Sequence, residues 1–183
     1  MNVRMTGLPG VMLIEPNVHE DDRGFFLETY QKTRYEAALG HALEFTQDNH
    51  SRSHKRVIRG LHLQRQRPQA KLMRVARGAV FDVAVDVDPG SPNFGRWVSA
   101  ILSEDNKHQL FVPAGYAHGF QVISEIADLE YKCIGDYVPE DEVGVLWNDA
   151  ELGIPWPLAD ALLSAKDACL PTLSSLCTER AQA

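Results

Sequence analysis

The sequence has 183 residues, a length that suits one folded domain with room for a hydrophobic core. Hydrophobic residues make up 44% and charged residues 23%, as in ordinary globular proteins, and no apolar run approaches the ~20 residues of a membrane helix. The formal net charge of −7 disfavours a general nucleic-acid binder, which needs a basic face, but it allows a locally basic pocket for an anionic small molecule.

The cysteines, Cys133, Cys169 and Cys177, form no CxxC pair. An odd and sparse set is typical of reduced thiols and therefore predicts a cytoplasmic protein. No apolar run with a basic start opens the chain, so no signal peptide is predicted. We expect a single domain over residues 1–183, with its core at 11–170 and a loose tail at 178–183.

The N-terminal part of the chain predicts short strands and one helix. Val11–Ile14 is an apolar run, and Phe25–Tyr30 is strand-like because of its aromatic residues. A polar loop, His19–Gly24, separates them. The segment Lys32–Leu39 has helix-forming residues and is followed by Gly40, a natural C-cap, so a helix is expected there.

From residue 45 onward the pattern predicts β-structure. Phe45–His50 alternates so that Gln47 and Asn49 share one face, and the polar, basic Ser51–Arg56 is expected to be a loop. Further strands are predicted at Val57–Gln64, Lys71–Val75, Ala79–Val87, Arg96–Leu102, Gln109–Val112, Gly119–Val122 and Asp128–Cys133. A short helix is expected at Ala159–Ala168. Many short strands with little helix predict a mainly β sandwich or barrel.

Two segments match the motifs of a cupin, but with an incomplete set of metal ligands. The first cupin motif has HxH, and here His62 is followed by Gln64 instead of a second histidine; no carboxylate follows in residues 65–68. The second motif is present as Pro113–His118. His62 and His118 supply two imidazoles, whereas metal sites usually need three or more protein ligands. The chain therefore resembles a cupin without a catalytic metal.

Without a metal, His62 is a candidate general base, because an imidazole titrates near neutral pH. Tyr131 is a candidate acid: Leu129, Tyr131 and Cys133 share one face of the predicted strand. Lys71 would be the cation that assists Tyr131 or stabilises an oxyanion. The ordinary alternative is a core tyrosine whose hydroxyl is satisfied by a hydrogen bond.

Arginines could bind an anion at the same place. On a regular strand Arg59 points away from His62, but Gly60 between them allows a bend or bulge that brings both to the pocket. Arg59 with Arg23 could then hold a phosphate, although a lone arginine is more often a solvated surface charge.

Several motifs occur in one order along the chain: Asp22-Arg-Gly-Phe-Phe26, Gln47-Asp-Asn-His-Ser51, Arg59-Gly-Leu-His-Leu-Gln64, Gln69-Ala-Lys71, Gly78-Ala-Val-Phe-Asp-Val83, Gly90-Ser-Pro-Asn-Phe-Gly95, Pro113-Ala-Gly-Tyr-Ala-His-Gly-Phe120 and Tyr131-Lys132. In this combination the chain resembles the dTDP-4-dehydrorhamnose 3,5-epimerase family. The resemblance implies a cupin-type β jelly roll, a homodimer, and catalysis without a cofactor.

The resemblance also implies roles for single residues. His62 corresponds to the proton acceptor, Tyr131 to the proton donor, Asp167 to the carboxylate that orients the histidine, and Lys71 to the residue near the C4 oxygen. Tyr137 is a rival acid or a base-stacking residue, and the role of Asp82 is open. The implied substrate-binding residues are Arg23, Glu28, Gln47, Asn49, Arg59, His118, Glu142 and Lys166, of which Arg23 and Glu28 would serve the partner subunit's site.

The implied chemistry suits these residues, because C3 and C5 of a 4-keto sugar both flank the ketone and so carry acidic protons. Three other functions share much of the pattern: an epimerase that inverts one centre of another dTDP-deoxysugar, a 3,4-ketoisomerase, and a non-catalytic cupin that binds sugar nucleotides. Retention of both a base and an acid argues against the last. No nucleic-acid or membrane partner is expected.

Overall fold

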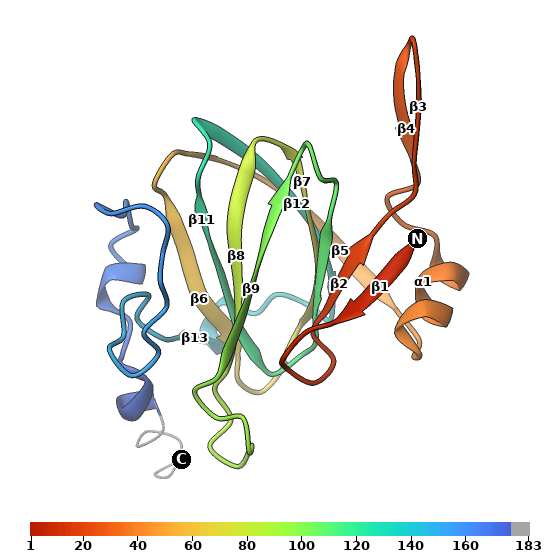
Figure 1. Ribbon diagram of the computed structural model, residues 1–183. Coiled ribbons are helices and arrows are strands. Elements are labelled where there is room, and N and C mark those ends of the chain that lie inside the picture. The colour runs from red at the N-terminus through yellow and green to blue at the C-terminus, as the bar shows by residue number, and fades with distance from the viewer. Residues whose placement is uncertain (177–183) are drawn as a thin grey trace.

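The computed structural model describes residues 1–176, and two antiparallel sheets that face each other make up most of it (Figure 1). One sheet has six strands in the order β1 (Asn2–Met5), β2 (Met12–Glu15), β10 (Gln109–Val112), β7 (Ala70–Arg77), β12 (Ile126–Ile134) and β5 (Phe45–His54). The other has five, in the order β13 (Glu142–Gly144), β6 (Ile58–Gln64), β11 (Tyr116–Val122), β8 (Ala79–Asp86) and β9 (Trp97–Ser103). The predicted mainly β jelly roll is confirmed.

The main core fills part of the space between the two sheets. It is built from inward-facing aliphatic and aromatic side chains of both sheets, such as Met73 and Leu129 from one and Val80 and Phe120 from the other. Alternation along the strands places these residues inside and leaves their neighbours on the outer faces. Other clusters cover the outer faces of the two sheets. Where the main core ends, polar side chains line the space between the sheets.

Helix α1 (Lys32–Leu39) covers the outer face of the six-stranded sheet and has the predicted bounds. The Gln31 side chain accepts a hydrogen bond from the Arg34 amide at its start, and Gly40 ends it in a left-handed conformation, with φ of 79°. Tyr35 and Leu39 are buried against that sheet. The helix therefore has a packing role and lies away from the cavity described below.

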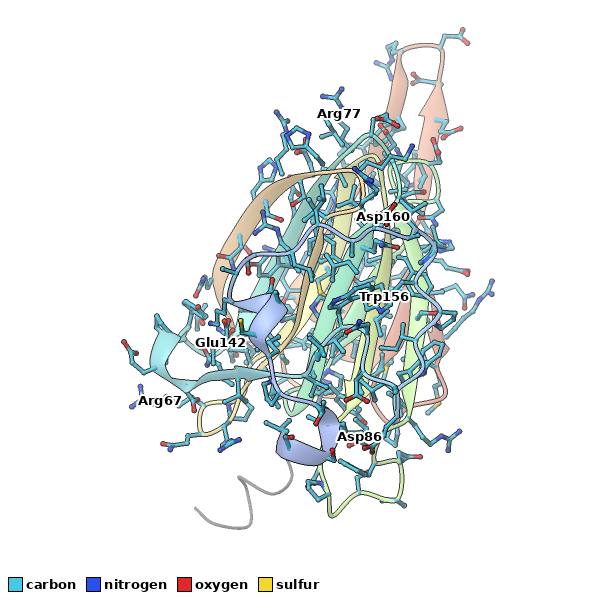
Figure 2. The ribbon with its side chains drawn as sticks, turned by 90° about the vertical axis from the view of Figure 1, so that its left-hand side faces the viewer. Arg67, Arg77, Asp86, Glu142, Trp156 and Asp160 are labelled. Carbon is cyan, nitrogen blue, oxygen red and sulfur yellow. The ribbon has the colours of Figure 1, made fainter. Side chains whose placement is uncertain are left out.

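The C-terminal part of the described chain covers the outer face of the five-stranded sheet (Figure 2). Trp156 packs edge-on against Phe81 of β8, and its indole nitrogen donates to the Trp147 carbonyl at 2.7 Å. Two single turns of 3-10 helix lie in this part, η1 (Pro139–Asp141) and η2 (Asp167–Cys169). This C-terminal part brings η2 beside β6, close to His62.

Two expectations about the chain path after residue 45 were wrong, as was the loop expected at His19–Gly24, where His19–Asp21 belong to strand β3 (Val18–Asp21). The expected loop at Ser51–Arg56 is largely strand, because β5 pairs with β12 along its whole length as far as His54. The expected helix at Ala159–Ala168 is absent apart from the start of η2 at Asp167, since Leu162 pairs with Val57 just before β6 and Asp160 has a positive φ of 55°. The backbone partners supplied by neighbouring strands decided both conformations.

A hairpin of β3 (Val18–Asp21) and β4 (Gly24–Leu27) projects from the barrel (Figure 1). The expected strand Phe25–Tyr30 is partly right, because β4 starts one residue earlier and ends at Leu27. Phe25 and Phe26 are 55% and 69% exposed. The hairpin thus displays aromatic side chains to the outside. In the described part of the chain, no helix has the length and apolar character to cross a membrane.

Candidate active site

A cavity of about 610 Å³ lies between the sheets, where polar side chains replace the apolar core. Both sheets and the segment before η2 line it. Most of the predicted site residues line this cavity: Gln47, Asn49, Arg59, His62, Lys71, His118, Tyr131, Glu142, Lys166 and Asp167. Residues far apart in sequence are therefore brought to one place.

The six-stranded sheet supplies two rows of side chains to the cavity. In one row Cys133 of β12 lies between Gln47 of β5 and Lys71 of β7, and in the next row Tyr131 lies beside Asn49. Directly opposed residues on neighbouring strands point to the same face. Strand pairing therefore places the buried lysine one row away from the candidate acid.

The five-stranded sheet presents two histidines directly opposite each other, His62 on β6 and His118 on β11. The expected bend in β6 is present: Gly60 has a φ of +103°, and the pairing with β11 shifts register there. A side chain at Gly60 would collide with the backbone of Gly119, 2.8 Å away. The bend allows Arg59 and His62 to line the same cavity.

His62 is held by a buried carboxylate. Its Nε2 lies 2.6 Å from Oδ1 of Asp167, which reaches it from η2. The amide of Asp167 in turn donates to the Ser164 hydroxyl at 3.0 Å. When Nε2–H donates to the carboxylate, Nδ1 is left as the proton acceptor. The role of Ser164 was not predicted, although Ser164-Ala-Lys-Asp167 has the spacing of a capping box.

Lys71 lies deep in the cavity wall, and its surroundings set its charge. Burial lowers the pKa of Lys71, and the charges of Cys133, Glu142 and Asp82 oppose that effect. Burial also raises the pKa of the Cys133 thiol, against the influence of Lys71 and a hydrogen bond from Asn49. A cation with so little water around it is a strong stabiliser for an anionic oxygen.

Tyr131 keeps its proton in this environment. Burial raises the pKa of Tyr131, and the nearby negative groups add to this, whereas Arg59 opposes it. The main cation acting on Tyr131 is therefore Arg59, whereas the sequence suggested Lys71. A phenol that stays protonated at neutral pH can donate a proton to a carbanion-like intermediate.

A carboxylate, an ammonium group and a phenol meet at one rim of the cavity. Lys166 donates a hydrogen bond to Glu142. Burial alone would raise the pKa of Glu142, but the Lys166 bond and the charges of His62 and Lys71 leave it lowered. Tyr137 lines the same rim and is half-exposed. An exposed aromatic ring at a cavity mouth is suited to stack on a planar ligand.

Arg23 and Glu28 are not brought to the cavity of their own chain. Arg23 lies on the hairpin turn with its side chain 90% exposed and paired to Asp21 at 2.5 Å. Glu28 pairs with Arg34 of α1 at 2.9 Å. Both residues therefore face outward from a single chain.

Metal ligation has little support among the described residues, which contain no group of three or more His, Cys, Asp and Glu side chains placed to bind one ion. His62 and His118 each bind a different carboxylate, Asp167 and Asp82. Each imidazole has therefore one nitrogen occupied by a side chain.

The chain is similar to proteins of one family along nearly its whole length. The family model for dTDP-4-dehydrorhamnose 3,5-epimerase matches residues 5–175. The enzyme of this name from Escherichia coli is 51% identical over 178 residues, covering 96% of each chain, and that from Pseudomonas aeruginosa is 53% identical over 168 residues, covering 91% of this chain and 93% of the relative.

A similar solved structure is that of a dTDP-6-deoxy-D-glucose-3,5-epimerase from Legionella pneumophila in complex with dTDP-4-keto-L-rhamnose. It superimposes with a TM-score of 0.94 at 49% identity, covering 97% of this chain and 95% of that chain. The similarity therefore extends to the whole fold, including the strands that line the cavity.

Proposed function

Since the chain belongs to the dTDP-4-dehydrorhamnose 3,5-epimerase family, we propose that it inverts C3 and C5 of dTDP-4-dehydro-6-deoxy-D-glucose to give dTDP-4-dehydro-L-rhamnose. The observation that carries the mechanism is the placement of His62 and Tyr131 on opposite sheets across one cavity. Epimerisation needs a base on one face of a sugar ring and an acid on the other, and this pair supplies both.

His62 removes the proton from C3 or C5, and Asp167 holds its ring with Nδ1 directed to the substrate. The electrons of the broken C–H bond form an enolate, whose oxygen at C4 is stabilised by Lys71. Tyr131 then donates a proton to the same carbon from the opposite face. His62 releases its proton and Tyr131 regains one from solvent before the second carbon reacts. Because the ketone itself acidifies both positions, the reaction requires no metal or other cofactor.

The anionic dTDP portion binds to the polar end of the cavity. Arg59, which also donates to the Ser53 hydroxyl at 3.0 Å, is placed to bind the diphosphate. Tyr137 at the rim stacks on the thymine, and Gln47, Asn49, His118, Glu142 and Lys166 complete the substrate contacts. These local groups explain how a chain with a net charge of −7 binds an anion.

The working unit is a homodimer. The hairpin β3–β4 projects from the barrel (Figure 1), and its residues Phe25 and Phe26 are exposed. A second copy of the chain would cover these rings and receive Arg23 and Glu28 at its own cavity. A cytoplasmic location fits the free thiols of Cys133 and Cys169.

The function is tested by proton NMR of dTDP-4-keto-6-deoxy-D-glucose with chelator-treated enzyme in D₂O. We expect loss of both the C3 and C5 proton signals and trapping of an L-sugar product by a reductase. His62→Ala should abolish both exchanges. Exchange at one carbon would instead indicate a single-centre epimerase, and tight binding without exchange would indicate a non-catalytic sugar-nucleotide-binding protein.

A further inference from the structure

Asp82 lies directly behind the candidate active site, in a position to which none of the steps above gives a role. It is on β8, is 0% exposed, and does not line the cavity itself. Its Oδ1 lies 2.8 Å from Nε2 of His118, on the neighbouring strand β11. The structure thus contains a second histidine–carboxylate pair, and His118 lies directly opposite His62, the histidine of the first.

The bond to Asp82 determines which nitrogen of His118 is free. An ionised carboxylate only accepts hydrogen bonds, so Nε2 of His118 must carry the proton. Nδ1 is then left with a lone pair on a ring that lines the cavity. Without Asp82 the ring could take either tautomer and turn the wrong atom to a sugar hydroxyl.

The second carboxylate oxygen of Asp82 is not accounted for by hydrogen bonding. Oδ2 is buried and has no hydrogen-bond partner within the described part of the chain. A buried carboxylate oxygen without a partner is costly and therefore needs a compensating positive charge. Lys71 is such a charge: Asp82 is among the groups whose negative charge favours its protonated form.

We propose that Asp82 is a positioning residue of this active site, which holds His118 in one tautomer and supplies negative charge that keeps Lys71 an ammonium ion. This inference rests on the proposed function, because it is the enolate of the 4-keto sugar that the ammonium ion stabilises. The other titratable groups facing Lys71 are Cys133 from β12 and Glu142 from β13.

The alkaline side of the pH–activity profile reports the charge of Lys71. Burial lowers the pKa of Lys71 and raises the pKa of Tyr131 and Cys133, so it brings loss of the Lys71 proton to lower pH and moves loss of the other two protons to higher pH. Removing the charge of Asp82 destabilises the ammonium form. The alkaline limb of kcat/KM must therefore move to lower pH in Asp82→Asn, a change that keeps the size of the side chain.

The experiment compares three variants with the wild-type enzyme over the pH range. Asp82→Asn should lose activity at about pH 9 by about tenfold more than wild type, relative to each enzyme's own maximum. Asp82→Glu, which keeps the charge, should restore the position of the limb even if kcat is lower. Asp86→Asn is the matched control, because Asp86 is also buried on β8 but bonds to Ser91 outside the cavity. The alkaline limb of kcat/KM in Asp86→Asn should lie at the same pH as in wild type.

An unmoved limb in Asp82→Asn, or an equal shift in Asp86→Asn, would overturn the proposal. A second measurement does not depend on turnover or on how the Asp82 and Asp86 variants fold. In wild-type enzyme with ¹⁵N-labelled histidine, His118 is assigned by comparison with His118→Gln, and its proton should lie on Nε2 at neutral pH. A proton on Nδ1 would refute the inference. Absence of turnover in wild type would instead refute the proposed function and leave this NMR result to stand alone.

Discussion

The two side chains that would transfer protons differ in how the fold prepares them. His62 is oriented by a 2.6 Å contact with Asp167, so geometry prepares the base. Tyr131 is prepared by burial, which raises the pKa of its phenol and keeps it protonated. A base held by a carboxylate and an acid held neutral by burial can work at the same pH.

Tyr131→Phe should lower kcat for epimerisation by about 10²–10⁴-fold, because it removes the only proton that is delivered to the second face. His62 remains, so exchange of the C3 or C5 proton with deuterium should persist. Rates are measured by coupled reduction of the product, and exchange is measured by NMR. Tyr137→Phe keeps the ring that stacks and should change kcat much less; the opposite ranking would make Tyr137 the acid.

At the scale of elements, the edge strand β5 depends on side-chain pairing with β12. Arg52 of β5 binds Asp128 of β12 through two hydrogen bonds, of 2.6 and 2.8 Å. The arginine holds the pKa of the Asp128 carboxyl down, to about 2. This pair lies on the part of β5 that the sequence predicted to be a loop. Cross-strand charge pairing thus extends the strand that carries Gln47 and Asn49.

Asp128→Asn should lower stability at neutral pH, because it removes this ion pair. A carboxyl with a lowered pKa in the folded state stabilises the fold at pH values above its unfolded pKa of about 4, and the benefit is lost as the pH falls toward about 2. The difference between variant and wild type should therefore shrink across that window. Urea unfolding at a series of pH values measures it.

The matched control for this prediction is Asp48→Asn. Asp48 joins the same two strands through Lys132 at 2.9 Å, but its side chain is 71% exposed. Exposed pairs contribute little to stability. Equal effects of the two substitutions at neutral pH would show that the Arg52–Asp128 pair has no special role.

At the scale of the whole molecule, the barrel is complete in one chain but the set of predicted binding residues is not. Arg23 lies on the hairpin and does not line the cavity of its own chain, whereas His62 does. If the hairpin serves a second copy, each active site combines residues of two chains. The activity of a mixture of variants would then depend on which chains pair in one dimer.

Mixing two defective variants should therefore restore activity. Arg23→Ala should lower kcat/KM by about tenfold or more through loss of a charge-assisted bond to the substrate, and His62→Ala should be inactive. In a heterodimer the cavity with an intact His62 receives the intact Arg23 of its partner. After subunit exchange, kcat/KM should exceed the mean of the two parent proteins. A value equal to that mean would place Arg23 in its own chain's site.

Many residues that line the cavity could be predicted from the sequence because they lie in local motifs. His62 follows the bend at Gly60, and Tyr131 shares a strand face with Cys133, so alternation alone indicated an inward tyrosine. Helix α1 was predicted to its ends because its C-cap glycine is a local signal. The expected loose tail at 178–183 lies outside the described residues.

By itself, the sequence determined the fold class and the family and predicted the residues that we propose carry the chemistry, since strand alternation, turn residues and motifs act over short stretches of chain. Only the tertiary structure decided that β5 continues to His54, that the segment at Leu162 is extended, and that Asp82 lies behind His118. These features depend on hydrogen-bond partners distant in the chain, and no local pattern records which strand will supply them.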